Sequence, residues 1–107
     1  MKVTRYHKLV RDKIPDIIEQ SGRQCEIETL NKKEYIKALD AKLDEELAEY
    51  QESKSLEELA DLLEVIRAVA VARGFSLEEL ERIRAQKAAE RGGFEHRILL
   101  RTVCSAD

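Results

Sequence analysis

The sequence has no tryptophan, and its aromatic residues are three Tyr and two Phe, or 5% of the chain. Proteins that bind single-stranded nucleic acid without sequence preference stack the bases on aromatic side chains. Charge of one sign is also lacking, since 19 Lys and Arg stand against 22 Asp and Glu, for a formal net charge of −3. Non-specific nucleic-acid binding depends on a surplus of cationic side chains. We therefore expect no nucleic-acid partner.

Cysteine is scarce, with only Cys25 and Cys104, which are too few for a disulfide scaffold. No apolar run approaches the roughly 20 residues that a membrane-spanning helix needs. Residues 1–13 also lack the apolar segment of a signal peptide. These absences predict no membrane partner, a cytoplasmic location and reduced thiols.

Stretches rich in Pro, Gly or Ser, internal repeats and low-complexity tracts are all missing from the 107 residues. The length fits one domain over residues 1–107. A chain of this size buries only about two thirds of its unfolded surface. Partner chains are therefore expected to complete its core.

What the sequence does contain is mostly helix signals. Asp12 as a cap, with Pro15 in the first turn, predicts a short helix that Gly22 ends. A cap residue followed three positions later by Glu predicts three more helices, which open at Asn31, Ser55 and Ser76 and end near Glu52, Gly74 and Gly92. Alternating side chains predict short strands at 24–29 and 96–103, which could pair as a small ribbon. The expected fold is mostly α, an antiparallel helical bundle in which the second and third helices form a hairpin.

The near-neutral total conceals three charged segments. Residues 1–13 hold five basic residues and one acidic residue, and residues 82–101 hold six basic and two acidic residues. Between them, residues 40–64 hold ten acidic and two basic residues. A fold held together by complementary surface charge is one explanation of this pattern.

Several carboxylates of the acidic segment fall on apolar helix faces. At about 100° per residue, Glu46 lies within roughly 20° of Leu39, inside the apolar stripe of the second helix. Glu49 falls at the edge of that stripe, and Glu45 points further towards solvent. Burying an unpaired charge costs several kcal/mol or more, so Glu46 requires an explanation.

The third helix shows the same anomaly. Its apolar residues cover roughly 220° of the circumference, too much for packing on one side only, so a partner chain is expected on the other. Glu58 and Asp61 flank Val65 in angle on this helix. Glu46 and Glu49 therefore face a second i, i+3 acidic pair on the neighbouring helix. Such spacing also occurs by chance in Glu-rich helices, where the acids pair with Lys and Arg.

Four acidic oxygen donors between two helices suit a hard divalent cation such as Mg²⁺, which takes carboxylates and completes its shell with water and phosphate. No His or Cys cluster favours Zn²⁺, because His7 and His96 are isolated and the two cysteines are far apart. The sequence thus predicts Glu46, Glu49, Glu58 and Asp61 as metal ligands.

The basic segments offer groups that could bind phosphate beside such a metal. Arg84, Lys87 and Arg91 share one side of the fourth helix, within roughly 80° of each other. Lys8, Arg11 and Lys13 immediately precede the first helix. The alternatives are snorkelling over apolar surface for the helical residues and a solvated arm for the N-terminal ones.

Four motifs, in order over almost the whole chain, resemble one protein family. They are KLVRDKIP at 8–15, KLDEELAE at 42–49, EELADLLEV at 57–65 and RGGF at 91–94. Together they resemble the all-α nucleoside triphosphate pyrophosphatase superfamily of MazG-like and phosphoribosyl-ATP pyrophosphohydrolase-like proteins. The metal motif of that family, ExxE followed by ExxD, falls on the four carboxylates selected above.

The resemblance implies a Mg²⁺-dependent hydrolase that cleaves a nucleoside triphosphate into a monophosphate and pyrophosphate. Mn²⁺ could replace Mg²⁺, and house-cleaning of non-canonical nucleotides is one role that such an enzyme could have. The resemblance also implies a homodimer or homotetramer, and phosphate contacts from Lys87 and Arg91. We expect Glu46 and Lys87 to be catalytic, together with Glu45 if it orients the attacking water.

Two alternatives remain open. Only eight residues separate Glu49 from Glu58, fewer than in MazG itself, which places the chain nearer the phosphoribosyl-ATP pyrophosphohydrolase branch of histidine biosynthesis. A non-catalytic helical module that binds nucleotide or forms oligomers is the other reading.

Overall fold

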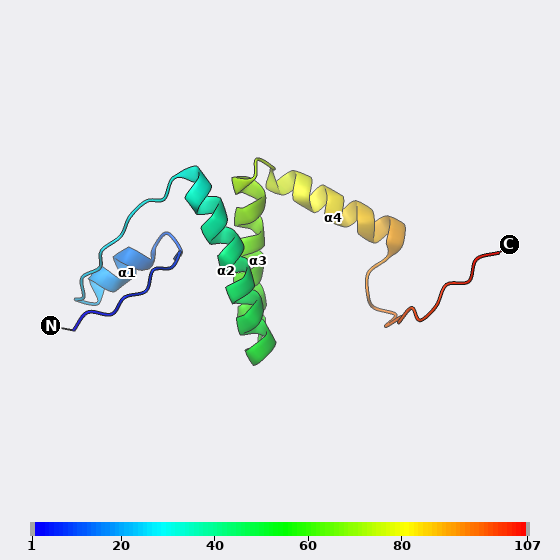
Figure 1. Cartoon of the computed structure of the whole chain (residues 1–107), viewed down its shortest axis with the longest axis horizontal. Helices are drawn as coiled ribbons and strands as arrows, with labels where there is room; N and C mark the ends of the chain where they lie inside the picture. Colours follow the sequence, from blue (N-terminus) through cyan, green and yellow to red (C-terminus); the bar gives the residue numbers. More distant parts are fainter. Residues whose placement is uncertain (1, 107) are drawn as a thin grey trace. The chain divides into compact units, whose positions relative to one another are not determined.

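The computed structural model describes residues 2–106, which form four α-helices and no strand (Figure 1). The helices are α1 (Ile14–Gln20), α2 (Lys32–Ser53), α3 (Leu56–Ala72) and α4 (Leu77–Arg91). The prediction of a mostly α fold is confirmed.

The chain divides into two units, Met1–Phe75 and Ser76–Asp107. The first unit contains α1, α2 and α3, and the second contains α4 and the C-terminal segment. The single domain predicted over residues 1–107 stays a prediction.

Three of the four helices begin at the predicted caps. In each, the side-chain oxygen of the cap accepts a hydrogen bond from the backbone N–H three residues later, at 2.9 Å for Asn31, 3.2 Å for Ser55 and 3.0 Å for Ser76. At α4 the Glu79 carboxylate accepts in return from the Ser76 N–H, at 3.2 Å, which completes a capping box. These starts depend on local chemistry alone, which explains why the sequence predicts them.

The start of α1 differs from the prediction, because Asp12 is not its cap. Lys13 takes the cap position and its side chain makes no capping hydrogen bond, while Pro15 lies in the first turn as expected. The Ile14 N–H donates to the Arg11 carbonyl at 3.1 Å, so Asp12 lies inside the turn that leads into the helix. A carboxylate within that turn is not at the helix boundary and cannot cap it.

The predicted ribbon is wrong for the part of the chain that the structure describes. Residues 24–29 and 96–103 contain no strand, and their apolar side chains are exposed, to 67% at Ile27 and 84% at Ile98. Alternation of side chains indicates a segment able to form a strand, but a strand also needs a partner backbone.

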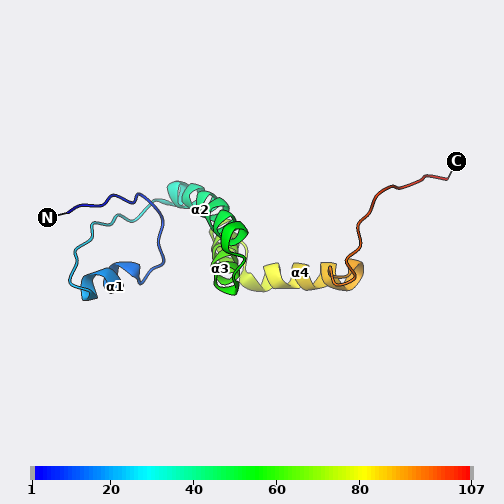
Figure 2. The same ribbon diagram turned by 90° about the horizontal axis from the view of Figure 1, so that it is seen from below.

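Helices α2 and α3 form the predicted antiparallel hairpin and lie side by side in both views (Figures 1 and 2). Lys54 and Ser55 connect them, and Lys54 adopts the left-handed conformation that so short a link requires, with φ 56°. At the other end of the hairpin, the Arg73 guanidinium pairs with the Asp40 carboxylate at 2.8 Å. This ion pair joins α2 to the residue that follows α3, in agreement with the antiparallel arrangement of the two helices.

The hairpin buries few side chains by itself. Leu39 of α2 and Val65 of α3 are the buried hydrophobic residues in the described part of the chain, and Glu46 is the buried charged residue. On α3, Leu59, Leu63 and Ile66 remain 42%, 57% and 37% exposed. The apolar surface of α3 therefore exceeds what α2 covers, as its wide apolar face predicts.

Across residues 2–106, none of the helices combines the length and the apolar character needed to cross a membrane.

Candidate metal centre

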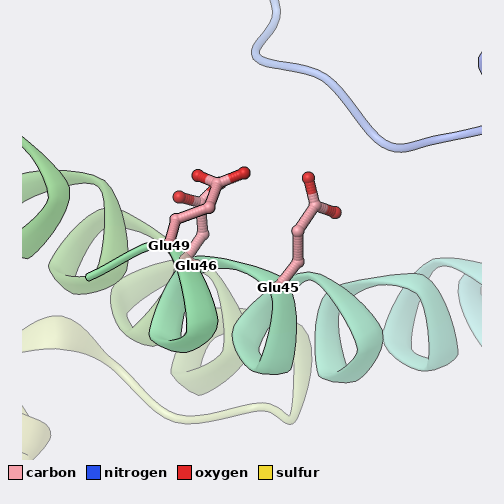
Figure 3. Close-up of side chains that lie close together, drawn as sticks. All are labelled: Glu45, Glu46 and Glu49. Carbon is pink, nitrogen blue, oxygen red and sulfur yellow. The ribbon is translucent and has the colours of Figure 1, made fainter. Parts of the chain in front are cut away.

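Helix α2 presents three carboxylates on one side, from Glu45, Glu46 and Glu49 (Figure 3). One carboxylate oxygen from each residue lies within 4.8 Å of the corresponding oxygens of the other two. The spacing places Glu49 beside both Glu45 and Glu46, because residues three and four positions apart are neighbours on a helix surface. Like charges this close repel one another unless a proton or a cation intervenes.

Helix α3 brings two further carboxylates to the same place. Oxygens of Glu46, Glu58 and Asp61 also lie within 4.8 Å of one another, so Glu46 belongs to both groups. We call these five residues, Glu45, Glu46, Glu49, Glu58 and Asp61, the carboxylate cluster. The structure thus gathers all four predicted metal ligands around Glu46, and it adds Glu45.

Glu46 is the buried centre of the cluster, with 6% of its surface exposed. Burial raises the pKa of its carboxyl above the ordinary 4.5, and a hydrogen bond with Glu49 and the charge of Glu49 raise it further. Lys42, with its Nζ 3.4 Å from Glu46 Oε1, acts in the opposite direction on the same pKa. The net direction is upward, so burial and Glu49 outweigh Lys42 in their effect on the pKa of Glu46.

Two oxygens of the cluster have no partner. Glu46 Oε2 and Glu58 Oε2 are buried and accept no hydrogen bond within the described residues. Buried polar atoms are nearly always satisfied in native proteins, and an exception is explained by a bound water, an ion or a functional role. These two atoms come from different helices, so a single ligand between α2 and α3 could satisfy both.

Three cationic side chains neutralise other parts of the cluster. Lys42 Nζ and Lys8 Nζ each lie 3.5 Å from Glu45 Oε1, and Arg11 Nη2 lies 2.6 Å from Asp61 Oδ1. Lys8 and Arg11 were predicted to bind phosphate, and the structure brings both to the carboxylates. The ion-pair explanation of the acidic residues thus accounts for Glu45 and Asp61, but it leaves Glu46 Oε2 and Glu58 Oε2 unsatisfied.

Lys42 is the site residue that sequence reasoning missed. Its spacing supplied a signal, because Lys42 precedes Glu45 by three and Glu46 by four positions, where oppositely charged side chains meet on a helix. Its side chain is only 17% exposed, so it belongs to the buried part of the site.

The predicted orientations of Glu45 and Glu49 are reversed. Glu45 was expected to point further towards solvent than Glu49. Its side chain is instead partly buried, at 34% exposed, whereas Glu49 is exposed. Lys8 and Lys42 both approach Glu45 and cover it. A helical-wheel angle does not include contacts from residues outside the helix, and Lys8 lies outside it.

The remaining predicted phosphate ligands are Lys13 in the first unit and three residues of α4 in the second. Lys13 is exposed at the start of α1. Arg84 forms a two-point ion pair with Glu81, at 2.6 and 2.9 Å, which raises the pKa of Arg84 and lowers that of Glu81. Lys87 and Arg91 are exposed on α4. Because α4 belongs to the second unit, its share in a site with the carboxylates stays a prediction.

The donor set fits a hard divalent cation. All five residues of the cluster offer carboxylate oxygens, the ligands that Mg²⁺ and Mn²⁺ accept. The cluster contains no His or Cys that would favour a softer metal. A dication would satisfy the two unpartnered oxygens and relieve the repulsion around Glu46.

No model of a known protein family matches the chain, and no solved structure matches it. A curated protein of Mycolicibacterium smegmatis, described as an uncharacterized protein, is 62% identical to the chain over 42 residues. That match covers 39% of this chain and 43% of the relative. The chain therefore matches less than half the length of this relative, whose printed description assigns no activity.

Proposed function

We propose that the protein is a Mg²⁺-dependent nucleoside triphosphate pyrophosphohydrolase that converts a nucleoside triphosphate and water into a monophosphate and pyrophosphate. One observation carries the proposal. Glu46 is buried at the centre of carboxylates from two helices, and its Oε2 atom has no partner in the described residues. A nucleotide enzyme of this type needs a place where a hard cation meets phosphate oxygens, and the carboxylate cluster has the chemistry for it.

The four ordered motifs give the proposal its reaction. Their resemblance to the all-α nucleoside triphosphate pyrophosphatases places the metal motif on Glu46, Glu49, Glu58 and Asp61. The distances around Glu46 support this assignment, because they bring the four carboxylates together and do not depend on the resemblance. A role in removing non-canonical nucleotides, in the cytoplasm, belongs to the same proposal.

Each residue has a role under this proposal. The four motif carboxylates hold Mg²⁺, which when bound polarises the α-phosphate and lowers the pKa of an attacking water. Glu45 accepts a hydrogen bond from that water and orients it. Lys87 stabilises negative charge on the departing pyrophosphate, and five further cations bind its oxygens. These five are Lys8, Arg11, Lys13, Arg84 and Arg91.

The proposal includes assembly into a homodimer or homotetramer built as an antiparallel helical bundle. The exposed apolar side chains of α3, which include Leu59 and Leu63, support it. A second hairpin packed on this face would bury them and complete the core.

The test is release of pyrophosphate from a panel of common and damaged nucleoside triphosphates in the presence of Mg²⁺. We expect turnover that EDTA abolishes and that falls at least about a hundredfold in Glu46→Gln, because the amide removes a charged ligand. Glu52→Gln is the matched control, since Glu52 is an exposed carboxylate of α2 outside the cluster, and it should keep parental turnover. Parental turnover by Glu46→Gln would disprove the assignment of the site.

The same panel decides between the alternatives. The two-residue link between α2 and α3 agrees with the short spacer that favours phosphoribosyl-ATP as substrate, and pyrophosphate release from that nucleotide alone would establish it. The ion pairs that already neutralise Glu45 and Asp61 favour a module that binds without turnover. Nucleotide binding with no release from any member of the panel would establish that reading instead.

A further inference from the structure

Arg11 reaches the carboxylate cluster from the segment that precedes α1. Its guanidinium Nη2 donates to Asp61 Oδ1 at 2.6 Å, although the two residues are 50 positions apart. Lys8 makes the second link, to Glu45 at 3.5 Å. Residues 2–10 make no backbone hydrogen bond within the described chain. Two ion pairs to the carboxylate cluster thus connect this N-terminal segment to the α2–α3 hairpin.

A cation in the cluster and Arg11 would compete for the same carboxylate. Asp61 belongs to the group that includes Glu46 and Glu58, the residues with unpartnered buried oxygens. A dication held by these three residues would place two positive charges beside the guanidinium. The dication repels the Arg11 guanidinium, and it also neutralises part of the negative charge on Asp61, so both effects weaken the ion pair between Arg11 and Asp61. Both side chains of the pair are about half exposed, 58% for Arg11 and 42% for Asp61, so Arg11 is free to turn away.

We infer that Arg11 exchanges partners: it pairs with Asp61 before a cation binds and with a phosphate of the substrate afterwards. The inference rests on the proposed function and assigns an order to events at that site. A guanidinium suits both partners, because its planar N–H groups match carboxylate and phosphate oxygens equally well. Lys8 follows the same course, since it is carried on the same segment. In this exchange Arg11 opposes binding of the cation alone and favours binding of the cation together with phosphate.

The exchange predicts effects of opposite sign for one substitution. In Arg11→Gln, Mn²⁺ alone should bind about two- to fivefold more tightly, the factor expected when a half-exposed ion pair no longer competes. Inorganic pyrophosphate in the presence of saturating Mg²⁺ should bind about tenfold more weakly, because a charge-assisted contact is lost. Electron paramagnetic resonance measures Mn²⁺ binding, and calorimetry measures pyrophosphate binding. Both are applied to the full chain, with helical circular dichroism to verify folding.

Arg5→Gln is the matched control, because it makes the same substitution in the same segment at an exposed residue that has no role in the proposed site. It should leave Mn²⁺ affinity within about 1.5-fold of the parental value, as a screened surface charge should. Equal tightening of Mn²⁺ binding by Arg5→Gln and Arg11→Gln would overturn the inference, because the effect would then be one of net charge. Unchanged or weaker Mn²⁺ binding by Arg11→Gln would also overturn it.

Failure of the proposed function gives a different result. If neither the parental chain nor Arg11→Gln binds Mn²⁺, the metal site itself is wrong, and the exchange is wrong with it. If both bind Mn²⁺ with equal affinity, the metal site stands and only the exchange is overturned. Binding by Arg11→Gln alone supports the exchange in its strongest form, in which Arg11 excludes the free cation.

Discussion

At the scale of single residues, Glu46 combines features that each oppose folding with a charged carboxylate. It is buried, its pKa is raised by burial and by Glu49, and one of its oxygens has no partner in the described residues. Proteins keep such groups where function requires them, at a cost in stability. The raised pKa gives this cost a pH dependence that can be measured.

We predict that Glu46→Gln stabilises the metal-free chain at pH 7 by roughly 1 kcal/mol, a typical single-substitution effect. Folding raises the pKa of this carboxyl, so the folded state favours the protonated form, which the neutral amide resembles. The gain should be absent below about pH 4.5, the ordinary value for glutamate, and should develop as the pH rises through the folded-state pKa. Denaturant unfolding in EDTA between pH 4 and pH 8, followed by circular dichroism, measures it.

Glu52→Gln should show no such dependence, because Glu52 is exposed. In Glu46→Gln, Lys42 still has Glu45 as an ion-pair partner, so the substitution leaves no buried cation without a partner. A less stable Glu46→Gln at pH 7 would show that the ion pair with Lys42 outweighs burial and repulsion.

At the scale of helices, the cap of α3 links stability to the carboxylate cluster. Ser55 Oγ accepts from the Glu58 N–H at 3.2 Å, and Glu58 is itself a member of the cluster. A cap therefore fixes the first turn of α3, where a predicted metal ligand lies.

We predict that Ser55→Ala lowers the free energy of unfolding by about 1 kcal/mol and weakens Mn²⁺ binding several-fold, because the first turn frays. Ser76→Ala is the matched control: it removes an equivalent cap from α4, which carries no residue of the cluster. It should reduce helicity without changing Mn²⁺ affinity. Thermal unfolding measures the loss of stability, and Mn²⁺ titration measures the loss of affinity. Equal loss of Mn²⁺ affinity in both variants would contradict a specific link between the Ser55 cap and the carboxylate cluster.

The helix scale also shows how far the sequence predicts this structure. The caps at Asn31, Ser55 and Ser76 were predictable because each depends on residues three positions apart. The gathering of acids around Glu46 was predictable from helical angles and a short hairpin link. The ribbon and the approach of Lys8 and Arg11 depend on contacts distant in sequence, which periodicity cannot specify. The alternation of side chains at 96–103 carries no information on whether a partner strand is present. The helical-wheel angle of Glu45 takes no account of Lys8, which lies outside the helix and pairs with Glu45.

At the scale of the whole molecule, the exposed apolar surface is the feature that the chain alone does not explain. Leu39 and Val65 are the hydrophobic side chains buried in the described residues, whereas a stable domain needs a larger core. Extended exposed apolar surface in a folded protein is typical of a contact site for another protein, a membrane or a ligand, and the proposed assembly would cover it. The apolar residues of α3 lie on the hairpin that carries the carboxylate cluster, so assembly and the proposed activity should depend on each other.

We predict that the parental chain sediments at two or four times its 12.3 kDa mass, and that Leu63→Glu, on the exposed face of α3, shifts it towards the monomer. A charge buried in an apolar interface costs several kcal/mol, about a hundredfold or more in the association constant. Ile27→Glu, at a similarly exposed apolar residue outside the helices, is the control and should leave the mass unchanged. Sedimentation at several concentrations measures this, with pyrophosphate release assayed on the same samples. A parental chain that stays monomeric at every concentration would contradict assembly through α3, and full activity in a monomeric Leu63→Glu would show that the carboxylate cluster works without a second copy.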